Sequence, residues 1–190
     1  MVRGILLAAG RGNRFGADKL MQPLTEGRSV ALAAADTLIN ALPGSIAVCR
    51  PEQSRLIEQL LEVGFRVETC EQADRGMGFT LATAAIATGE QENLLIALAD
   101  MPFIELATIQ QLVAALEAGA KLVQPRYHGQ PGNPVGLNYS FRQRLLAPQG
   151  DFGARQLLKQ RAAEITYIDL DDPGILRDID RPEDLPGQPD

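Results

Sequence analysis

The chain has 190 residues, of which 45% are hydrophobic and 22% are charged, and its formal net charge is −6. This length suits one domain, and the composition is ordinary for a globular protein with a buried core. The negative charge disfavours nucleic acid and membrane surfaces as partners, because both are anionic. The start of the chain lacks the features of a signal peptide and no run reaches transmembrane length, so we expect a cytoplasmic protein.

Strand-like and helix-like patterns alternate along the chain. Apolar or alternating runs predict strands at residues 5–9, 45–49, 65–69, 93–99 and 122–124. Helical spacing predicts helices at about 29–42, 56–63, 79–87 and 106–116, with Ser29 as a cap and Gly64 and Gly119 as terminators. This alternation favours a mostly parallel sheet with helices on both faces. The pattern loosens after Pro125, so we expect a single domain over residues 1–190, in which about 125–169 form a smaller lobe.

The composition changes abruptly after the first predicted strand. The next ten residues contain three glycines and three cations: Gly10, Gly12, Gly16, Arg11, Arg14 and Lys19. Glycine lets a backbone approach a ligand closely, and arginine and lysine supply charged donors for phosphate oxygens. Residues 5–19 therefore predict a polyphosphate-binding loop, with an ordinary glycine-rich turn and solvated cations as the plain alternative.

Two familiar phosphate loops do not fit this stretch. The Walker pattern requires Ser or Thr after a Gly-Lys pair, whereas Gly16 is followed by Ala17. The dinucleotide-binding fingerprint requires a third glycine where Phe15 stands. Neither of these two patterns therefore accounts for the loop.

Residues 7–19 instead resemble the opening motif L-A-A-G-x-x-x-R-F/M-G-x-x-K of the molybdenum cofactor enzymes among the MobA-like NTP transferases, at each fixed position. The cytidylyl branch is the most similar, since the guanylyl branch usually has a glycine where Ala9 stands. The resemblance implies a Rossmann-like three-layer α/β/α fold with a mostly parallel twisted sheet, as in nucleotide-diphospho-sugar transferases. It also implies transfer of CMP from CTP to the terminal phosphate of molybdopterin or molybdenum cofactor, with release of pyrophosphate.

The same resemblance implies a set of partners and roles for the first loop. It implies Mg²⁺ as the cofactor, CTP (or GTP) and a phosphorylated pterin as substrates, and a downstream molybdoenzyme chaperone as a protein partner. Arg14 and Lys19 would be the catalytic cations. The nucleotide would lie against Leu7, Ala8, Ala9, Gly10, Gly12 and Lys19.

A second glycine-containing stretch precedes the third predicted helix. Gly76 and Gly78 lie before a helix N-terminus, whose positive end favours anions, and Thr80 falls in its first turn. A favourable helix start, with Met77 and Leu81 in the core, explains these residues equally well. The family has a similar G-M-x-x-S/T-L segment beside the nucleotide, which implies Gly78 and Thr80 as nucleotide contacts.

Asp100 ends an otherwise apolar strand. A carboxylate there is costly to bury unpaired, so it needs solvent, backbone donors or a cation such as Mg²⁺. The D-x-P motif of the family at this strand end implies that Asp100 is the metal ligand. Asp178 and Asp180 lie in an ending that resembles D-I-D-x-P-E-D-L, where we favour helix capping over a second metal ligand.

Segments 129–136 and 150–155 resemble G-x-x-G-H-P-V and G-D-x-G-A-R of the cytidylyl branch, which face the pterin, although turn chemistry or helix capping also explains them. The resemblance makes residues 125–169 the acceptor side and implies four acceptor contacts: Asn133, Pro134, Asp151 and Arg155. Asn133 replaces the usual histidine, which keeps open a related transferase with a different phosphorylated acceptor. A guanylyltransferase of the same fold is also open, as is a nucleotide-binding, cofactor-handling protein without turnover.

The remaining reactive side chains predict no further chemistry. Cys49 and Cys70 are too isolated for a zinc site or a disulfide framework, and each ends a predicted strand, where a free buried thiol is expected. His128 is the single histidine and lies among prolines and glycines, where we expect a loop residue. An acceptor phosphate is already anionic at neutral pH, so its attack needs no general base.

Overall fold

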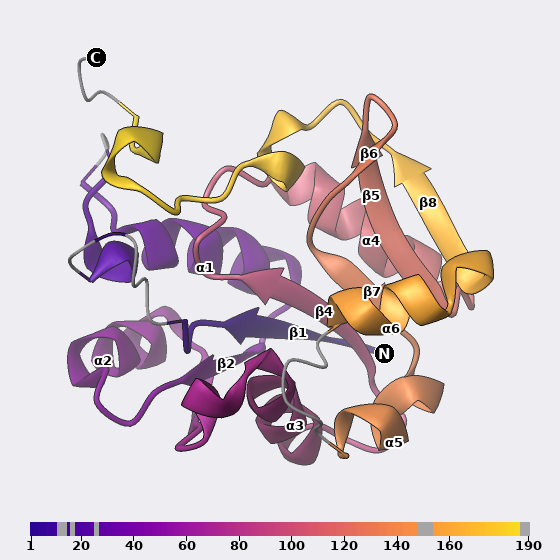
Figure 1. Ribbon diagram of the computed structural model, residues 1–190, viewed down its shortest axis with the longest axis horizontal. Coiled ribbons are helices and arrows are strands. Elements are labelled where there is room, and N and C mark those ends of the chain that lie inside the picture. The colour runs from indigo at the N-terminus through magenta and orange to yellow at the C-terminus, as the bar shows by residue number, and fades with distance from the viewer. Residues whose placement is uncertain (11–14, 16–17, 25–26, 148–153, 187–190) are drawn as a thin grey trace.

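The computed structural model describes residues 1–10, 15, 18–24, 27–147 and 154–186. Within these residues the chain forms one mixed sheet of eight strands between two layers of helices (Figure 1). The strands are β1 (Val2–Leu7), β2 (Ile46–Cys49), β3 (Arg66–Thr69), β4 (Asn93–Leu98), β5 (Leu122–Tyr127), β6 (Gln130–Pro131), β7 (Val135–Leu137) and β8 (Ile165–Asp169). The helices are α1 (Val30–Ala41), α2 (Ser54–Val63), α3 (Met77–Ala87), α4 (Leu106–Glu117), α5 (Arg142–Leu145) and α6 (Ala154–Gln160).

The strand order is β3-β2-β1-β4-β7-β5-β6, and β8 pairs with β5. Strands β1 to β4 run parallel to one another, and β8 runs parallel to β5. Only β7 and β6 pair with their neighbours in the antiparallel sense. The predicted Rossmann-like α/β/α fold with a mostly parallel sheet is therefore confirmed.

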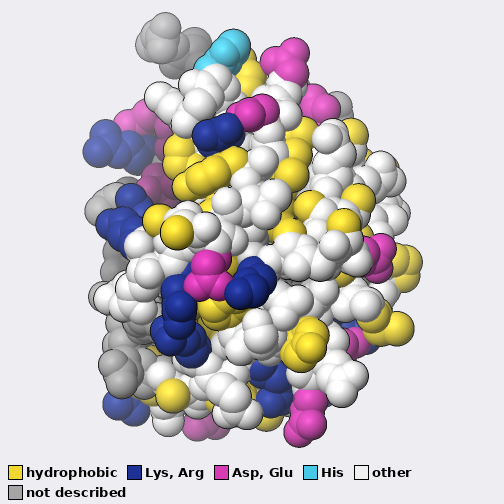
Figure 2. Space-filling model, turned by 90° about the vertical axis from the view of Figure 1, so that its right-hand side faces the viewer, with side chains coloured by type: hydrophobic (Ala, Val, Ile, Leu, Met, Phe, Trp, Pro, Cys, Tyr) yellow, Lys and Arg dark blue, Asp and Glu magenta, His cyan; other side chains and the backbone are white. Residues whose placement is uncertain are grey.

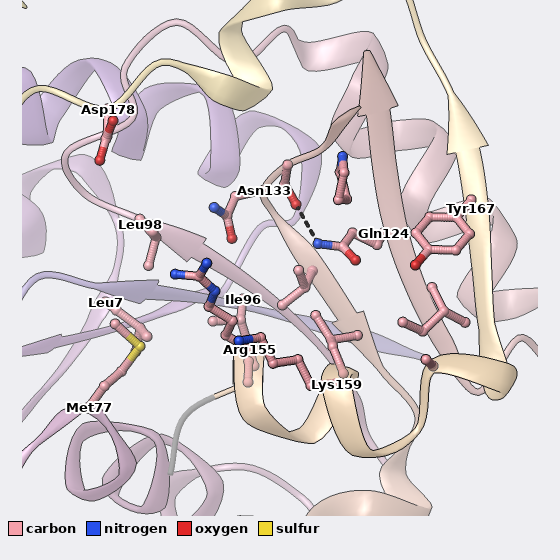
Figure 3. Close-up of a pocket in the computed structure, with 17 residues that line it drawn as sticks. Leu7, Met77, Ile96, Leu98, Gln124, Asn133, Arg155, Lys159, Tyr167 and Asp178 are labelled. Carbon is pink, nitrogen blue, oxygen red and sulfur yellow. Dashed lines mark hydrogen bonds between the residues drawn. The ribbon is translucent and has the colours of Figure 1, made fainter. Parts of the chain in front are cut away.

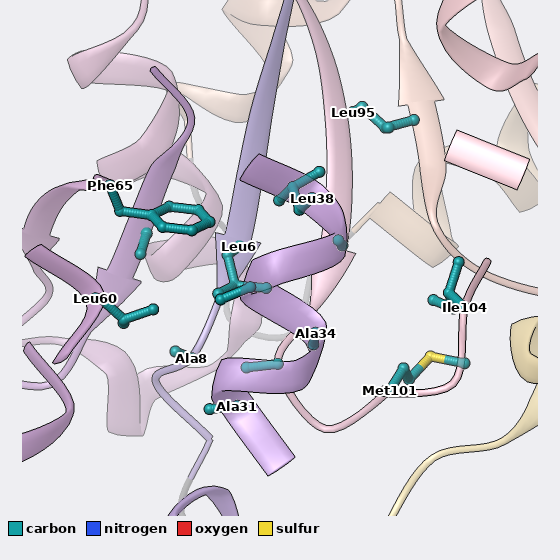
Figure 4. Close-up of a cluster of buried hydrophobic side chains, with 14 of the residues drawn as sticks. Leu6, Ala8, Ala31, Ala34, Leu38, Leu60, Phe65, Leu95, Met101 and Ile104 are labelled. Atoms are coloured by element: carbon teal, nitrogen blue, oxygen red, sulfur yellow. The ribbon is translucent and has the colours of Figure 1, made fainter. Parts of the chain in front are cut away.

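Each face of the sheet buries its own hydrophobic core. Side chains alternate along a strand, so Leu6 of β1 points to the layer of α1, α2 and α4, and Ile5 points to the layer of α3, α5 and α6. Figure 4 shows Leu6 against Leu38 of α1 in the first core. Ile5, Leu6 and Leu38 are all fully buried, and burial of a side chain of this size contributes about 1.5–3 kcal/mol to stability. Burial on both faces explains the continuous apolar sequences of β1 and β4.

The predicted helix ends are confirmed where the signal is local. The Ser29 side chain caps α1 by accepting a hydrogen bond from the Leu32 N–H, and Gly64 ends α2 with a left-handed φ of 104°. Helix α3 begins at Met77, two residues before the predicted start. Met77 is 46% exposed in the first turn, so its prediction as a core residue was wrong, whereas Leu81 is buried as predicted.

Residues 125–169 supply β6, β7 and β8 to the same sheet, together with α5 and α6. Strand β7 lies between β4 and β5, and it escaped prediction because it has three residues and contains a glycine. Gly136 allows α4 to pack closely there, since a Cβ at this position would lie 2.8 Å from Leu116 Cδ1 and this side chain would have to shift. Strand β8 also escaped prediction, because it is an edge strand whose side chains are half-buried or exposed.

The predictions for the cysteines and the histidine are confirmed. Cys49 and Cys70 are free and buried, and burial raises the pKa of the Cys49 thiol to about 12. His128 and Gly129 have φ values of 47° and 79° in the two-residue turn between β5 and β6. Positive φ at both positions is the geometry that a tight hairpin turn favours.

The surface beside β8 carries charges of both signs. Glu164 pairs with Lys121, and Asp169 of β8 pairs with Arg126 of β5. Figure 2 shows both acidic and basic side chains on this face. No helix in the described ranges has both the length and the apolar character needed to cross a bilayer.

Candidate active site

The carboxyl ends of β1, β2, β3 and β4 lie side by side at one edge of the sheet, because these strands are parallel. Ligands of such sheets bind outside this edge. The loop after β1, the segment before α3 and Asp100 after β4 all emerge there. The topology therefore brings three predicted site segments together, although up to about 90 residues separate them in sequence.

Lys19 lies at the centre of a cluster of charges. It begins a short 3-10 turn (Lys19–Met21) and is only 7% exposed. Its Nζ donates to Asp100 Oδ2 at 2.7 Å and to Asp180 Oδ1 at 2.9 Å. Burial lowers the pKa of Lys19, but the hydrogen bonds and charges of the two aspartates outweigh this effect and raise it above its ordinary value of 10.5. Lys19 is therefore a fixed cation at neutral pH.

The C-terminal segment brings Asp180 to Lys19. The Ile179 N–H donates to the Asp100 carbonyl at 2.9 Å, and the Ile179 side chain is fully buried in a cluster with Phe15 and Val30. In Figure 1 this yellow segment lies beside the indigo segment that follows β1. Burial of Ile179 fixes the neighbouring residues on either side of it, Asp178 and Asp180, at the edge of the site.

The helix-capping role that we favoured for Asp178 and Asp180 was wrong. Arg181 is the N-cap of the final turn (Pro182–Asp184), and the Asp184 carboxylate accepts from the N–H groups of Asp180 and Arg181. The Asp180 carboxylate instead accepts from Lys19, 161 residues away. The local sequence favours a cap, and only the packing of Ile179 redirects this side chain.

The cluster has the donor chemistry that a hard divalent cation requires. Asp100 and Asp180 place one carboxylate oxygen each within 2.9 Å of the same Lys19 nitrogen, so these oxygens converge. Desolvation, together with the charges of Asp180 and Asp100, raises the pKa of the nearby Asp178 carboxyl. The described residues contain no group of three or more His, Cys, Asp or Glu side chains arranged around a metal. Magnesium typically uses one or two carboxylates and completes its shell with water and substrate phosphates, so the pair fits.

The two predicted nucleotide segments lie on neighbouring elements. Ala8, Ala9 and Gly10 directly follow β1, and the Ala8 N–H continues its pairing with β2 by donating to the Val48 carbonyl. Thr80 is 5% exposed in the first turn of α3, as predicted, and Gly78 is buried beside it. Leu7 of β1 and Met77 of α3 line the same pocket.

This pocket has a volume of about 580 Å³ and runs along the sheet under α6 (Figure 3). Its floor is apolar and includes Leu7, Ile96, Leu98 and Val135. Its polar side chains come from several elements, and they are Gln124, Asn133, Arg155, Lys159, Tyr167 and Asp178. Because Asp178 is two residues from Asp180, the pocket begins at the edge of the charge cluster.

Two of the four predicted acceptor residues line this pocket. Asn133 and Arg155 both line the pocket, and Figure 3 shows Arg155 extending from α6 toward Asn133. Pro134 is buried and does not belong to the lining. The predictions for Gly12, Arg14 and Asp151 fall outside the described residues.

Residues 4–165 match the family model described as the MobA-like NTP transferase domain. The chain belongs to the MobA-like NTP transferase family. The predicted family is thus confirmed, whereas the cytidylyl branch stays a prediction. The chain is 26% identical over 194 residues to nicotine blue oxidoreductase of Paenarthrobacter nicotinovorans, covering 97% of this chain and 94% of that protein. It is 24% identical to the purine catabolism protein PucB of Bacillus subtilis, covering 95% and 92%.

Solved structures support the fold of this MobA-like transferase. The crystal structure of Rv0371c from Mycobacterium tuberculosis has a TM-score of 0.85 and 23% identity, covering 96% of this chain and 94% of that one. The same protein in complex with manganese has a TM-score of 0.75 and 20% identity, with 89% and 88% covered. Molybdopterin-guanine dinucleotide biosynthesis protein A from Archaeoglobus fulgidus has a TM-score of 0.67 and 18% identity, with 96% and 94% covered.

Several site residues of this MobA-like transferase were not predicted from the sequence. Lys159 follows Arg155 by one helical turn, and this spacing alone was a usable signal for a second cation on the same helix face. Gln124 and Tyr167 left no such signal, because their place in the pocket depends on the pairing of β5 with β8. Arg50 and Gln53, which donate to the carbonyls of Ala9 and Ala8, also escaped notice.

Proposed function

We propose that this chain transfers CMP from CTP to the terminal phosphate of molybdopterin or molybdenum cofactor and releases pyrophosphate. One observation carries the proposal: the pocket under α6 begins beside the cluster of Lys19, Asp100 and Asp180. A triphosphate at the cluster and an acceptor in the pocket would then meet near Asp178, which lines the pocket and is two residues from Asp180. Membership of the MobA-like NTP transferase family supports a nucleoside triphosphate as the first substrate.

In the proposed reaction an oxygen of the acceptor phosphate attacks the α-phosphorus of CTP. The new P–O bond forms as the bond between the α-phosphorus and the bridging oxygen breaks, and pyrophosphate leaves with that electron pair. The nucleophile is an anion at neutral pH, so the chain needs to supply no general base. The barrier comes from bringing two anions together, and positioning with charge stabilisation lowers it.

Different residues of the chain have different roles in this proposed reaction. Lys19 turns from the aspartates toward the triphosphate and neutralises part of its charge, together with Arg14 as the sequence predicts. Asp100 and Asp180 would hold a divalent cation, magnesium in the prediction, which supplies Lewis-acid stabilisation of the phosphate oxygens. Ala8, Ala9, Gly10, Gly78 and Thr80 remain the proposed contacts of the nucleotide.

The pocket fits an acceptor with a flat apolar body and an anionic group. Its apolar floor accommodates a ring system, and Arg155 and Lys159 provide two cations for a phosphate. Asn133 and Gln124 offer amide groups that pair with the polar edge of a heterocycle. Gln124 Nε2 already donates to the Gly132 carbonyl, which orients the side chain in the pocket wall.

The decisive experiment measures pyrophosphate release from each of CTP, GTP, ATP and UTP. Each nucleotide is mixed with molybdenum-bearing cofactor, bare molybdopterin, or a sugar phosphate as the control acceptor. We expect release only with a pterin phosphate and fastest with CTP. Release with GTP alone would reassign the chain to the guanylyl branch. Nucleotide binding without release from any pair would contradict an enzymatic role.

Ala9→Gly should weaken the preference for CTP over GTP. Ala9 is buried directly after β1, and in the proposed binding mode its methyl group would limit how deeply a base approaches the loop. Loss of this methyl group should reduce the ratio of kcat/KM for CTP to that for GTP by about tenfold, which is the range for one methylene in a binding site. An unchanged ratio would place base selection elsewhere, and Ala84→Gly in α3 controls for destabilisation of the same core.

A further inference from the structure

The Arg50 side chain is a buried cation at the carboxyl end of strand β2. It follows β2, which lies between β1 and β3, and only 8% of the residue is exposed. Burial of a guanidinium is costly unless its donors are satisfied by well-placed acceptors. Arg50 has such acceptors on both neighbouring strand ends, so its environment indicates a specific role at this edge of the sheet.

The guanidinium connects the loop after β1 with the segment after β3. Arg50 Nε donates to the Ala9 carbonyl at 2.7 Å, and Nη1 forms an ion pair with the Asp74 carboxylate. Asp74 lies in the short 3-10 turn (Ala73–Arg75) that leads into α3 through Gly76. The two segments that Arg50 joins are therefore those that carry the proposed nucleotide contacts.

Gln53 completes the arrangement from the same loop. Its Oε1 accepts from the Arg50 N–H at 2.7 Å, and its Nε2 donates to the Ala8 carbonyl at 3.1 Å. The carbonyls of Ala8 and Ala9 are thus both engaged by side chains that follow β2. Among the described residues, the N–H groups of Ala9 and Gly10 have no acceptor, so these donors stay available for a ligand. Fixed carbonyls also fix the direction of the N–H groups on the adjoining peptide planes.

We propose that Arg50 is a positioning residue for the nucleotide, which holds the backbone of Ala9 and Gly10 and the start of α3 in one fixed geometry. This inference rests on the proposed function, because it assumes that these segments bind a nucleoside triphosphate. A loop that is already held in its binding geometry loses less conformational entropy when the ligand binds. Arg50 therefore contributes to affinity for the nucleotide without contacting the acceptor.

Arg50→Lys tests this role directly. Lysine keeps the charge, but its single ammonium lacks the planar fork that reaches the Ala9 carbonyl and Asp74 together. We expect Kd and KM for the nucleotide to rise about tenfold or more, with KM for the acceptor unchanged. Amide hydrogen exchange at residues 8–10 should become faster in the free protein. Calorimetry, steady-state kinetics and mass-spectrometric exchange provide the three readouts, at a temperature well below the Tm of each variant.

Arg66→Lys is the matched control. Arg66 also pairs with a carboxylate and a carbonyl, since its Nε donates to Glu68 Oε1 at 2.9 Å and its Nη1 donates to the Ala87 carbonyl at 3.2 Å. Its side chain is 60% exposed, however, and it begins β3, so it lies at the amino ends of the parallel strands, opposite the candidate site. This variant should bind the nucleotide as the wild type does. Asp74→Asn serves as a second variant, which keeps the bond to Ala9, and it should raise the nucleotide Kd by less than Arg50→Lys.

The outcomes separate this inference from the proposed function. If the wild type binds a nucleoside triphosphate and both Arg50→Lys and Asp74→Asn bind it equally well, the positioning role is wrong and the proposed function stands. A lower Tm with unchanged Kd would likewise mean that Arg50 is only structural. If the wild type binds none of the four nucleotides, both proposals fail. If Arg50→Lys does not fold, the Kd of Asp74→Asn decides the question.

Discussion

Lys19→Met should lower kcat for nucleotidyl transfer by about a hundredfold to a thousandfold, the range for loss of one preorganised charge-stabilising donor. Methionine preserves the length and apolar stem of the side chain but cannot neutralise a triphosphate. Lys19 is buried and contacts the two aspartates, so a cation from the solvent does not easily take its place. Pyrophosphate release under saturating substrates measures the effect, and a thousandfold loss equals about 4 kcal/mol of transition-state stabilisation.

Measurements of Tm distinguish a lower kcat of the folded Lys19→Met protein from a loss of activity through unfolding. Lys19→Met removes the cation between Asp100 and Asp180, so we expect a lower Tm. The decrease in Tm should be moderate, because the Asp100 and Asp180 side chains are 23% and 43% exposed and keep contact with water. Lys121→Met is the control, since Lys121 pairs with Glu164 on the surface and should keep full turnover. A folded Lys19→Met protein with turnover close to the wild type would remove Lys19 from the mechanism.

Asp100→Asn should abolish the dependence of nucleotide binding on divalent cations. The substitution keeps the shape of the side chain and an oxygen acceptor, but it removes the negative charge that a hard cation requires. Lys19 retains Asp180 as a partner, so the fold should persist. We expect turnover to fall about a hundredfold or more, and calorimetric titration with CTP should give the same Kd with and without magnesium.

Asp36→Asn provides the comparison for Asp100→Asn. Asp36 of α1 pairs with Arg28 and takes no part in the ion pairs that Lys19 forms with the aspartates of the cluster, and its loss should leave the magnesium dependence intact. Titration of Asp100→Asn with magnesium and manganese extends the test to both cations. A wild-type magnesium requirement in the Asp100→Asn protein would assign the metal to other residues.

Several features of this protein follow from local sequence, because the interactions that create them lie within a few residues. The cap at Ser29 and the left-handed Gly64 depend on one helical turn each, and both are in place. The apolar runs of β1 and β4 predict buried strands, and their parallel order places the loop after β1 and Asp100 at one edge. The opening motif likewise predicts the family that the domain match confirms.

Strands β6 to β8 and the pocket under α6 needed the tertiary structure. Strand β7 has three residues and no periodicity to detect, yet it lies between β4 and β5 because both strands offer it unpaired backbone groups. Strand β8 then extends the sheet beside β5, and α6 lies over this part of it. The apolar floor, Gln124, Lys159 and Tyr167 meet in the pocket only through this pairing.

By itself the sequence determined the order of elements as far as β5, the caps at Ser29 and Gly64, and the presence of charged residues at strand ends, since each depends on neighbours along the chain. It did not determine which charges meet. Lys19 contacts Asp100 across 81 residues and Asp180 across 161, and Arg50 reaches Ala9 across 41. Such contacts form only after the strands align and Ile179 is buried, because hydrophobic packing of distant segments sets the positions of the polar groups between them.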